Sequence, residues 1–160
     1  MKMVRVPMES LIEVILLQLE TAKYANLTVT GCSMLPMLHQ YRDTVQLKPI
    51  EGKLKPGDIA LYRRDSGKYV LHRVIKVTEE EYLFCGDNQA VLEPVRQEQL
   101  IAFVTGFTKR GKPHNINEPL YRLYSYIWVK FFCLRKYYIW LRRRIGRLYN
   151  RMLNRRKSNG

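Results

Sequence analysis

Cysteine is scarce in this 160-residue chain, and its scarcity argues against two kinds of protein. The three cysteines, Cys32, Cys85 and Cys133, are odd in number, lie far apart and form no CxxC pair. A disulfide-stapled secreted fold and a structural zinc site both require a denser cysteine pattern. We therefore expect a reducing compartment, no bound metal and no other cofactor.

Long apolar runs are missing as well. The apolar stretch 11–19 is interrupted by Glu13 and Gln18, so it lacks the unbroken core of a signal peptide. The apolar pieces near the C-terminus are separated by basic residues, and none approaches the roughly 20 residues that a transmembrane helix needs. The sequence predicts neither a signal peptide nor a clear transmembrane helix.

Acidic residues end at Glu118. The chain has 28 Lys and Arg against 14 Asp and Glu, a net charge of +14, and twelve of the basic residues follow Glu118. A nearly neutral body is thus joined to a strongly cationic tail, and the two need separate explanations. Because 46% of the residues are hydrophobic, the body can form a packed core, which excludes wholesale disorder.

The middle of the chain has the periodicity of short strands. An Arg-Asp-Ser-Gly sequence at 64–67 suits a hairpin turn, and prolines and glycines separate the other runs. The expected strands cover 28–30, 44–48, 58–62, 69–77, 81–85 and 100–107. Strands at this density predict a mainly β fold with coiled antiparallel sheets or a partly open barrel.

Helices are expected on both sides of the β region. The stretch 11–19 is amphipathic, with Pro7 and Ser10 marking its start. A long basic amphipathic helix is expected in the tail, because apolar residues recur there at spacings of three and four. These residues are Ile127, Phe131, Leu134, Tyr138, Leu141, Ile145, Leu148 and Met152. We expect an N-terminal helix at 1–26, a β domain at 27–112, and a linker with the helical tail at 113–160.

The tail has the composition of a helix that lies on an anionic lipid surface, with aromatic residues on one face and cations elsewhere. The apolar stripe has two other possible uses, docking on the β domain or on a second copy, and binding nucleic acid. Nucleic acid is least favoured because no groove-reading motif is present. We expect residues 120–157 to bind an anionic membrane surface, peripherally and on the cytoplasmic face.

Candidate catalytic residues lie in three separate segments. Ser33 follows Gly31 and precedes Pro36, in a turn that displays its hydroxyl group. A serine in a tight turn is usually structural, but His72 lies on an expected strand and Asp87 follows the next one. These three residues supply a nucleophile, a general base and an acid that orients the base.

Four short blocks occur in a fixed order over about half of the chain. They are Gly31-x-Ser33-Met34-x-Pro36-x-Leu38, Lys55-Pro56-Gly57-Asp58-Ile59, His72-Arg73-Val74-Ile75 and Gly86-Asp87-Asn88. In this order and spacing they resemble the type I signal peptidase family and its LexA-like relatives, which implies the fold of that family. The usual bacterial members carry lysine where this chain has His72, so the resemblance is to the histidine-base branch.

The resemblance implies a serine endopeptidase that cleaves a preprotein or precursor peptide after small residues. Ser33 would attack the peptide bond, His72 would take its proton, and water would release the acyl-enzyme. Asp87 is the provisional orienting acid, while Glu93 stands where the histidine branch has a second aspartate, so the choice between them is open. The resemblance implies no cofactor and no small-molecule ligand.

Two other readings remain. A membrane-surface or nucleic-acid-binding adaptor that keeps the peptidase scaffold would leave Ser33 and His72 dispensable. A LexA-type self-cleaving repressor resembles the chain less, because it has a lysine base and a separate DNA-binding domain, whereas a single expected helix precedes Ser33.

Overall fold

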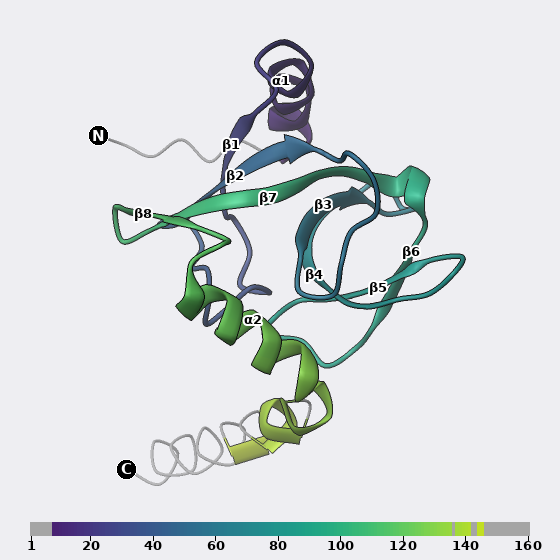
Figure 1. The fold of residues 1–160 in the computed structure, drawn as a ribbon, viewed down its shortest axis with the longest axis vertical. Helices are drawn as coiled ribbons and strands as arrows, with labels where there is room; N and C mark the ends of the chain where they lie inside the picture. Colours follow the sequence, from purple (N-terminus) through teal and green to yellow (C-terminus); the bar gives the residue numbers. More distant parts are fainter. Residues whose placement is uncertain (1–7, 136, 142–143, 146–160) are drawn as a thin grey trace, which may run out of the picture.

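The computed structural model describes residues 8–135, 137–141 and 144–145. This part of the chain is mainly β, with one open antiparallel sheet of eight strands. Helix α1 (Met8–Thr21) precedes the sheet, and helix α2 (Pro119–Lys130) follows it. Figure 1 shows the two helices at opposite ends of the molecule, with the sheet between them.

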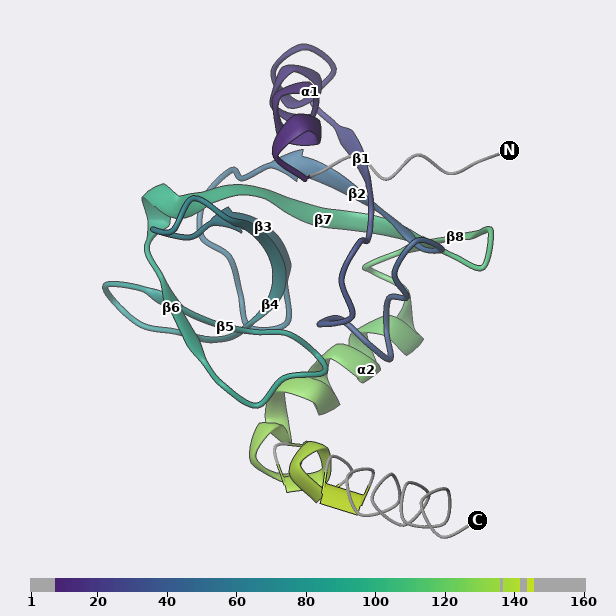
Figure 2. The ribbon, with the colours of Figure 1, turned by 180° about the vertical axis from the view of Figure 1, so that it is seen from behind.

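The sheet is built around the long strand β7, which pairs with three other strands. The elements are β1 (Ala25–Thr28), β2 (Thr44–Pro49), β3 (Ile59–Arg63), β4 (Tyr69–Val77), β5 (Tyr82–Cys85), β6 (Glu93–Val95), the 3₁₀-helix η1 (Gln97–Gln99), β7 (Leu100–Lys109) and β8 (Lys112–Asn115). The strand order is β1-β2-β7-β3-β4-β5-β6, with β8 paired to β7, and every pairing is antiparallel. Figure 2 shows β7 crossing the molecule while β3 to β6 curl below it.

The predicted mainly β, antiparallel architecture is confirmed, and β4 has the predicted ends. Strands β6 and β8 were not predicted, because they are short and contain Pro94 and Pro113, residues that sheets accept mainly at edges and ends. The expected strand at 28–30 is displaced. Strand β1 ends at Thr28, and residues 31–38 form turns and bends, so Ser33 lies in a turn.

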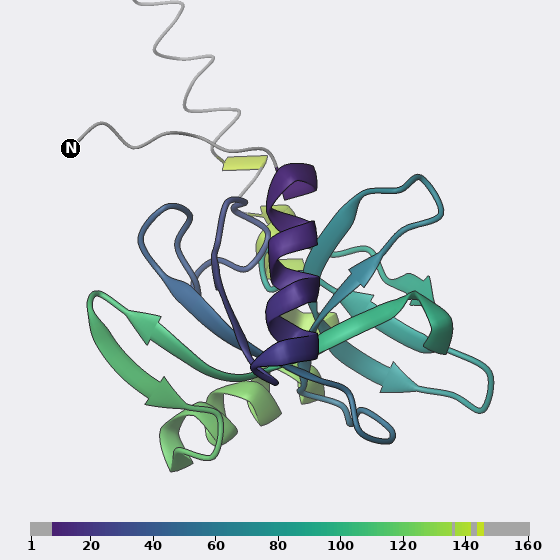
Figure 3. The same ribbon diagram turned by 90° about the horizontal axis from the view of Figure 1, so that it is seen from above.

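Two hydrophobic clusters form the core, and strand β3 contributes to both. Ile59 and Leu61 belong to one cluster, whereas Ala60 and Tyr62 belong to the other, as the alternation of side chains along a strand requires. Helix α1 lies across the strands in Figure 3 and adds its buried face to the first cluster. That face consists of Ile12, Ile15 and Leu19. Each such residue stabilises the fold by about 1.5–3 kcal/mol.

The helical tail differs from the single long helix that was expected. Helix α2 ends at Lys130, because Phe131 leaves the helical conformation with φ −99° and ψ 32°. Helical residues resume at 132–135 and continue at 137–141. The predicted stripe residues Leu148 and Met152 lie outside the described residues. Among the helices that the structure describes, none combines the length and apolar character that crossing a membrane requires.

Candidate active site

Ser33 and His72 come together at Gly86. A Cβ atom placed on Gly86 would lie 3.0 Å from Ser33 Cβ and 3.1 Å from His72 Nε2. Both side chains also line one cavity of about 240 Å³, together with Gly31, Tyr69 and other residues from β1, β4 and the adjoining loops. The structure therefore places two of the three predicted catalytic residues side by side, although they come from distant segments.

The turn that carries Ser33 is held by the loop that follows β5. The Asn88 backbone N–H donates a hydrogen bond of 2.7 Å to the Ser33 carbonyl oxygen, and Asn88 Nδ2 donates one of 3.3 Å to the Cys32 carbonyl oxygen. This close approach requires glycine at position 86, because a Cβ there would lie only 2.7 Å from the Ser33 carbonyl oxygen. Within the described chain, the Ser33 side-chain hydroxyl has no hydrogen-bond partner and so stays available for chemistry.

His72 is held as a neutral imidazole. Its side chain lies on β4 and is only 2% exposed. Burial lowers the pKa of His72 to about 4, while the negative charges of Glu93 and Asp87 partly oppose this effect. At neutral pH the ring is therefore uncharged, which is the form that a general base requires.

A hydrogen-bond relay behind His72 fixes which ring nitrogen carries the proton. The Tyr62 hydroxyl lies 3.1 Å from His72 Nδ1 and donates a hydrogen bond of 2.9 Å to Glu93 Oε2. Since the hydroxyl has one proton and gives it to the carboxylate, its oxygen accepts from Nδ1–H of the ring. This tautomer, assigned from the hydrogen-bond pattern, leaves the Nε2 lone pair free on the side of Ser33.

Glu93 is itself fixed by Arg64. Arg64 Nη2 donates to Glu93 Oε2 at 2.6 Å, and Arg64 Nε donates to the other carboxylate oxygen. Burial opposes the charge of Glu93, but the hydrogen bonds from Arg64 and Tyr62 hold its pKa below the ordinary value. The relay His72–Tyr62–Glu93 therefore ends on an ionised carboxylate, which Arg64 holds in place.

Asp87, the provisional orienting acid, makes no hydrogen bond with His72 among the residues that the structure describes. Asp87 accepts hydrogen bonds of 2.8 and 2.9 Å from Arg73 Nε and Nη2, and one of 3.1 Å from the Tyr124 hydroxyl. Neighbouring residues of a strand point to opposite faces, so His72 and Arg73 cannot meet the same carboxylate from one side. The other acid that the sequence left open, Glu93, reaches His72 through Tyr62.

Sequence reasoning missed Tyr62 and Arg64, and a signal for the tyrosine was present. The predicted hairpin turn fixes the register of β3 on β4, in which Ala60 pairs with His72. Tyr62, two residues along, lies on the same face as His72 and diagonal to it. Glu93 could not be placed in this way, because it enters through β6, the short strand in which it pairs with Phe84.

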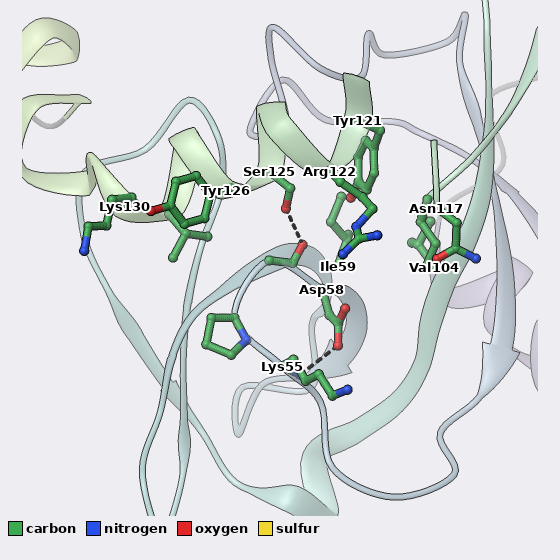
Figure 4. Close-up of a pocket in the computed structure, with 14 residues that line it drawn as sticks. Lys55, Asp58, Ile59, Val104, Asn117, Tyr121, Arg122, Ser125, Tyr126 and Lys130 are labelled. Carbon is green, nitrogen blue, oxygen red and sulfur yellow. Dashed lines mark hydrogen bonds between the residues drawn. The ribbon is translucent and has the colours of Figure 1, made fainter. Parts of the chain in front are cut away.

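A larger cavity of about 630 Å³ lies between α2 and the loop before β3 (Figure 4), and neither Ser33 nor His72 lines it. There Asp58 accepts a hydrogen bond of 2.7 Å from the Lys55 backbone N–H, and Ser125 Oγ donates one of 3.0 Å to the Gly57 carbonyl. These two side chains thus bind backbone groups. No group of three metal-ligating side chains occurs in the parts of the chain that are described.

Comparison with protein-family models and with curated proteins gave no match for this chain. Its function is therefore inferred from the geometry around Ser33 and His72.

Proposed function

We propose that this protein is a serine endopeptidase that resembles the type I signal peptidases of the histidine branch, with Ser33 as nucleophile and His72 as general base. The observation that carries the proposal is the meeting of Ser33 Cβ and His72 Nε2 at Gly86. A buried, neutral imidazole whose Nδ1 faces a hydroxyl–carboxylate relay supports it. The resemblance of the four sequence blocks adds the family and its coiled β fold.

In the proposed mechanism Ser33 Oγ attacks the scissile carbonyl carbon while its proton passes to His72 Nε2. The imidazolium that forms is disfavoured by burial and favoured by the negative charge of Glu93, which acts through Tyr62. His72 then gives the proton to the leaving amine, and an acyl-enzyme remains on Ser33. Water attacks this ester while His72 takes its proton, and His72 then returns that proton to Ser33 Oγ as the new C-terminal carboxylic acid leaves.

The substrate we propose is an extended precursor peptide with small residues before the cleaved bond. The cavity of about 240 Å³ is smaller than the roughly 300–1,000 Å³ of typical small-molecule sites. It lies beside Val29 and Gly31 after β1 and beside Tyr69 and Leu71 of β4. Backbone groups at such a position can pair with an extended peptide, while the limited volume favours small side chains.

The test is reaction of the full chain with a fluorophosphonate probe, together with cleavage of precursor peptides that carry alanine before the scissile bond. We expect labelling and cleavage by the wild type, with loss of both in Ser33→Ala, by at least about 1,000-fold in rate. Ser66→Ala is the matched control, because Ser66 is exposed in the β3–β4 turn, away from His72. It should keep both activities.

Two outcomes contradict the proposal. Equal labelling of the wild type and Ser33→Ala would place any reactive serine elsewhere. Absence of labelling and cleavage in a folded wild type would favour the non-catalytic adaptor.

A further inference from the structure

One face of α2 is fixed to the β domain by the buried pair Arg73 and Asp87. Arg73 Nη1 donates a hydrogen bond of 2.8 Å to Ser125 Oγ, and the Tyr124 hydroxyl donates to Asp87 Oδ2 at 3.1 Å. Trp128 Nε1 donates to the Asp87 carbonyl oxygen at 3.2 Å. This inner face continues after the break at Phe131, because Arg135 and Ile139 are also buried.

The residues that face away from the β domain, on α2 and on the helical stretch after the break at Phe131, are apolar and exposed. We call these residues the outer apolar face, and each of them is 38–66% exposed. They are Leu123, Ile127, Phe131, Leu134, Tyr138 and Leu141. Leu123 and Ile127 are four residues apart and so share one side of α2. Leu134, Tyr138 and Leu141, at spacings of four and three, share one side of the helical residues that follow the break at Phe131. The apolar stripe predicted from the sequence therefore points to solvent within the described residues, since the inner face makes the contacts with the β domain.

Basic residues surround the outer apolar face. Arg122, Lys130 and Arg144 are exposed in the described part of the tail. The sequence has twelve basic residues and no acidic residue after Glu118. Tyr126, Tyr137 and Trp140 are exposed as well, and aromatic rings of this kind favour the interface between lipid and water.

We propose that the outer apolar face and the basic residues around it bind the surface of an anionic lipid bilayer. A bilayer surface supplies an apolar layer and negative charge together, which matches both properties of the tail. A second copy would bring two cationic tails into contact, and a nucleic acid would satisfy the cations while the apolar face stayed in water. The proposal does not depend on the peptidase activity.

The experiment is co-sedimentation of the full chain with vesicles of phosphatidylcholine alone and of phosphatidylcholine mixed with phosphatidylglycerol. We expect binding to the mixed vesicles, weakened by salt, and little binding to phosphatidylcholine. The double variant Leu123→Gln/Leu134→Gln should bind the mixed vesicles at least about tenfold more weakly, because each leucine loses its transfer into the lipid. Circular dichroism checks that the variants are folded.

The matched control is Val14→Gln/Leu17→Gln, which replaces two aliphatic residues that are 52% and 60% exposed on α1. Helix α1 lies at the other end of the molecule from α2 (Figure 1), so this variant should bind like the wild type. Equal binding by the wild type and Leu123→Gln/Leu134→Gln would overturn the proposal, since charge alone would then suffice. Absence of vesicle binding by the wild type would overturn it too. A dimer that Leu123→Gln/Leu134→Gln dissociates would then assign the outer apolar face to a second copy, and binding of duplex DNA would assign the basic residues to nucleic acid.

Discussion

The two faces of strand β4 show opposite ways of burying an ionisable side chain. His72 points to one face, is nearly inaccessible and is neutral, because burial lowers its pKa to about 4. Arg73 points to the other face and is equally buried. Burial works against its charge, but Asp87 raises its pKa above the ordinary value. A direct counter-ion therefore decides which of two neighbouring groups keeps its charge.

The two faces also differ in what they hold. His72 faces a cavity and the Ser33 turn, whereas Arg73 joins Asp87 to α2 through Ser125 and Tyr121. The loop Gly86–Asn88 belongs to both regions, since Asp87 binds Arg73 while Asn88 binds the Ser33 carbonyl. The ion pair on the Arg73 face, which we call the charged face, thus holds the loop that positions the Ser33 turn beside His72. We call the His72 face the neutral face.

The largest expected effect comes from removing Asp87, the counter-ion of Arg73 on the charged face. Asp87→Ala leaves the Arg73 guanidinium buried without its counter-ion, and we expect the free energy of unfolding to fall by about 3–5 kcal/mol. Urea denaturation measures this change. The double variant Arg73→Met/Asp87→Ala should recover part of the loss, because the Arg73 charge is removed together with its counter-ion. Recovery should be incomplete, since the buried Arg135 guanidinium, 3.7 Å from Asp87 Oδ1, still loses that carboxylate.

Asp65→Asn is the control for this prediction, because Asp65 pairs with Arg96 on the surface and its side chain is 76% exposed. Its unfolding midpoint should stay nearly unchanged. Asp87→Ala with wild-type stability and a selective loss of activity would instead assign Asp87 a direct catalytic role.

The buried, neutral imidazole of His72 predicts that the stability of the fold depends on pH. In the unfolded chain His72 binds a proton below its ordinary pKa of 6.5, whereas in the folded chain it binds one only near pH 4. Stability should therefore fall as pH falls from 6.5 to 4, by up to about 3 kcal/mol relative to His72→Gln. The two proteins should differ little in slope above pH 6.5. Parallel stability curves from pH 7 to pH 4 would show that His72 titrates normally.

Gly86, where the two faces meet, predicts the next effect. In Gly86→Ala the new methyl group would lie 2.7 Å from the Ser33 carbonyl oxygen and 3.1 Å from His72 Nε2, so the loop at residue 86 and the Ser33 turn must move apart. A displacement of about 1 Å can lower kcat/KM by about 100-fold. Gly86→Val should lower it further. Peptide cleavage per folded molecule measures the effect, and unchanged cleavage by Gly86→Ala would mean that Ser33 and His72 do not act together.

The sequence was informative about strands and less so about partners across strands. The periodicity of 69–77 predicted β4, and the resemblance of the four blocks to the signal peptidase family implied that Ser33 and His72 lie together. The partner of Asp87 depended on register: Arg73 pairs with Cys85, so Asp87, two residues later, continues on the side of Arg73. That register includes an irregularity between Val74 and Lys76, which no local sequence signal marks.

The smallest predicted effect tests the hydrogen-bond relay behind His72. Tyr62→Phe removes the hydroxyl that accepts from Nδ1–H and donates to Glu93, so the ring loses the hydrogen bond that fixes its tautomer. Loss of one such hydrogen bond should lower kcat about tenfold. Tyr82→Phe is the matched control, because the Tyr82 hydroxyl donates a part-buried hydrogen bond of 2.8 Å to Gln97 Oε1, away from His72. It should cost about 1 kcal/mol of stability and leave kcat unchanged. If both variants lose stability and neither changes kcat, Tyr62 has a structural role only. A lower kcat confined to Tyr62→Phe, with a changed pH profile, makes it a positioning residue for the base.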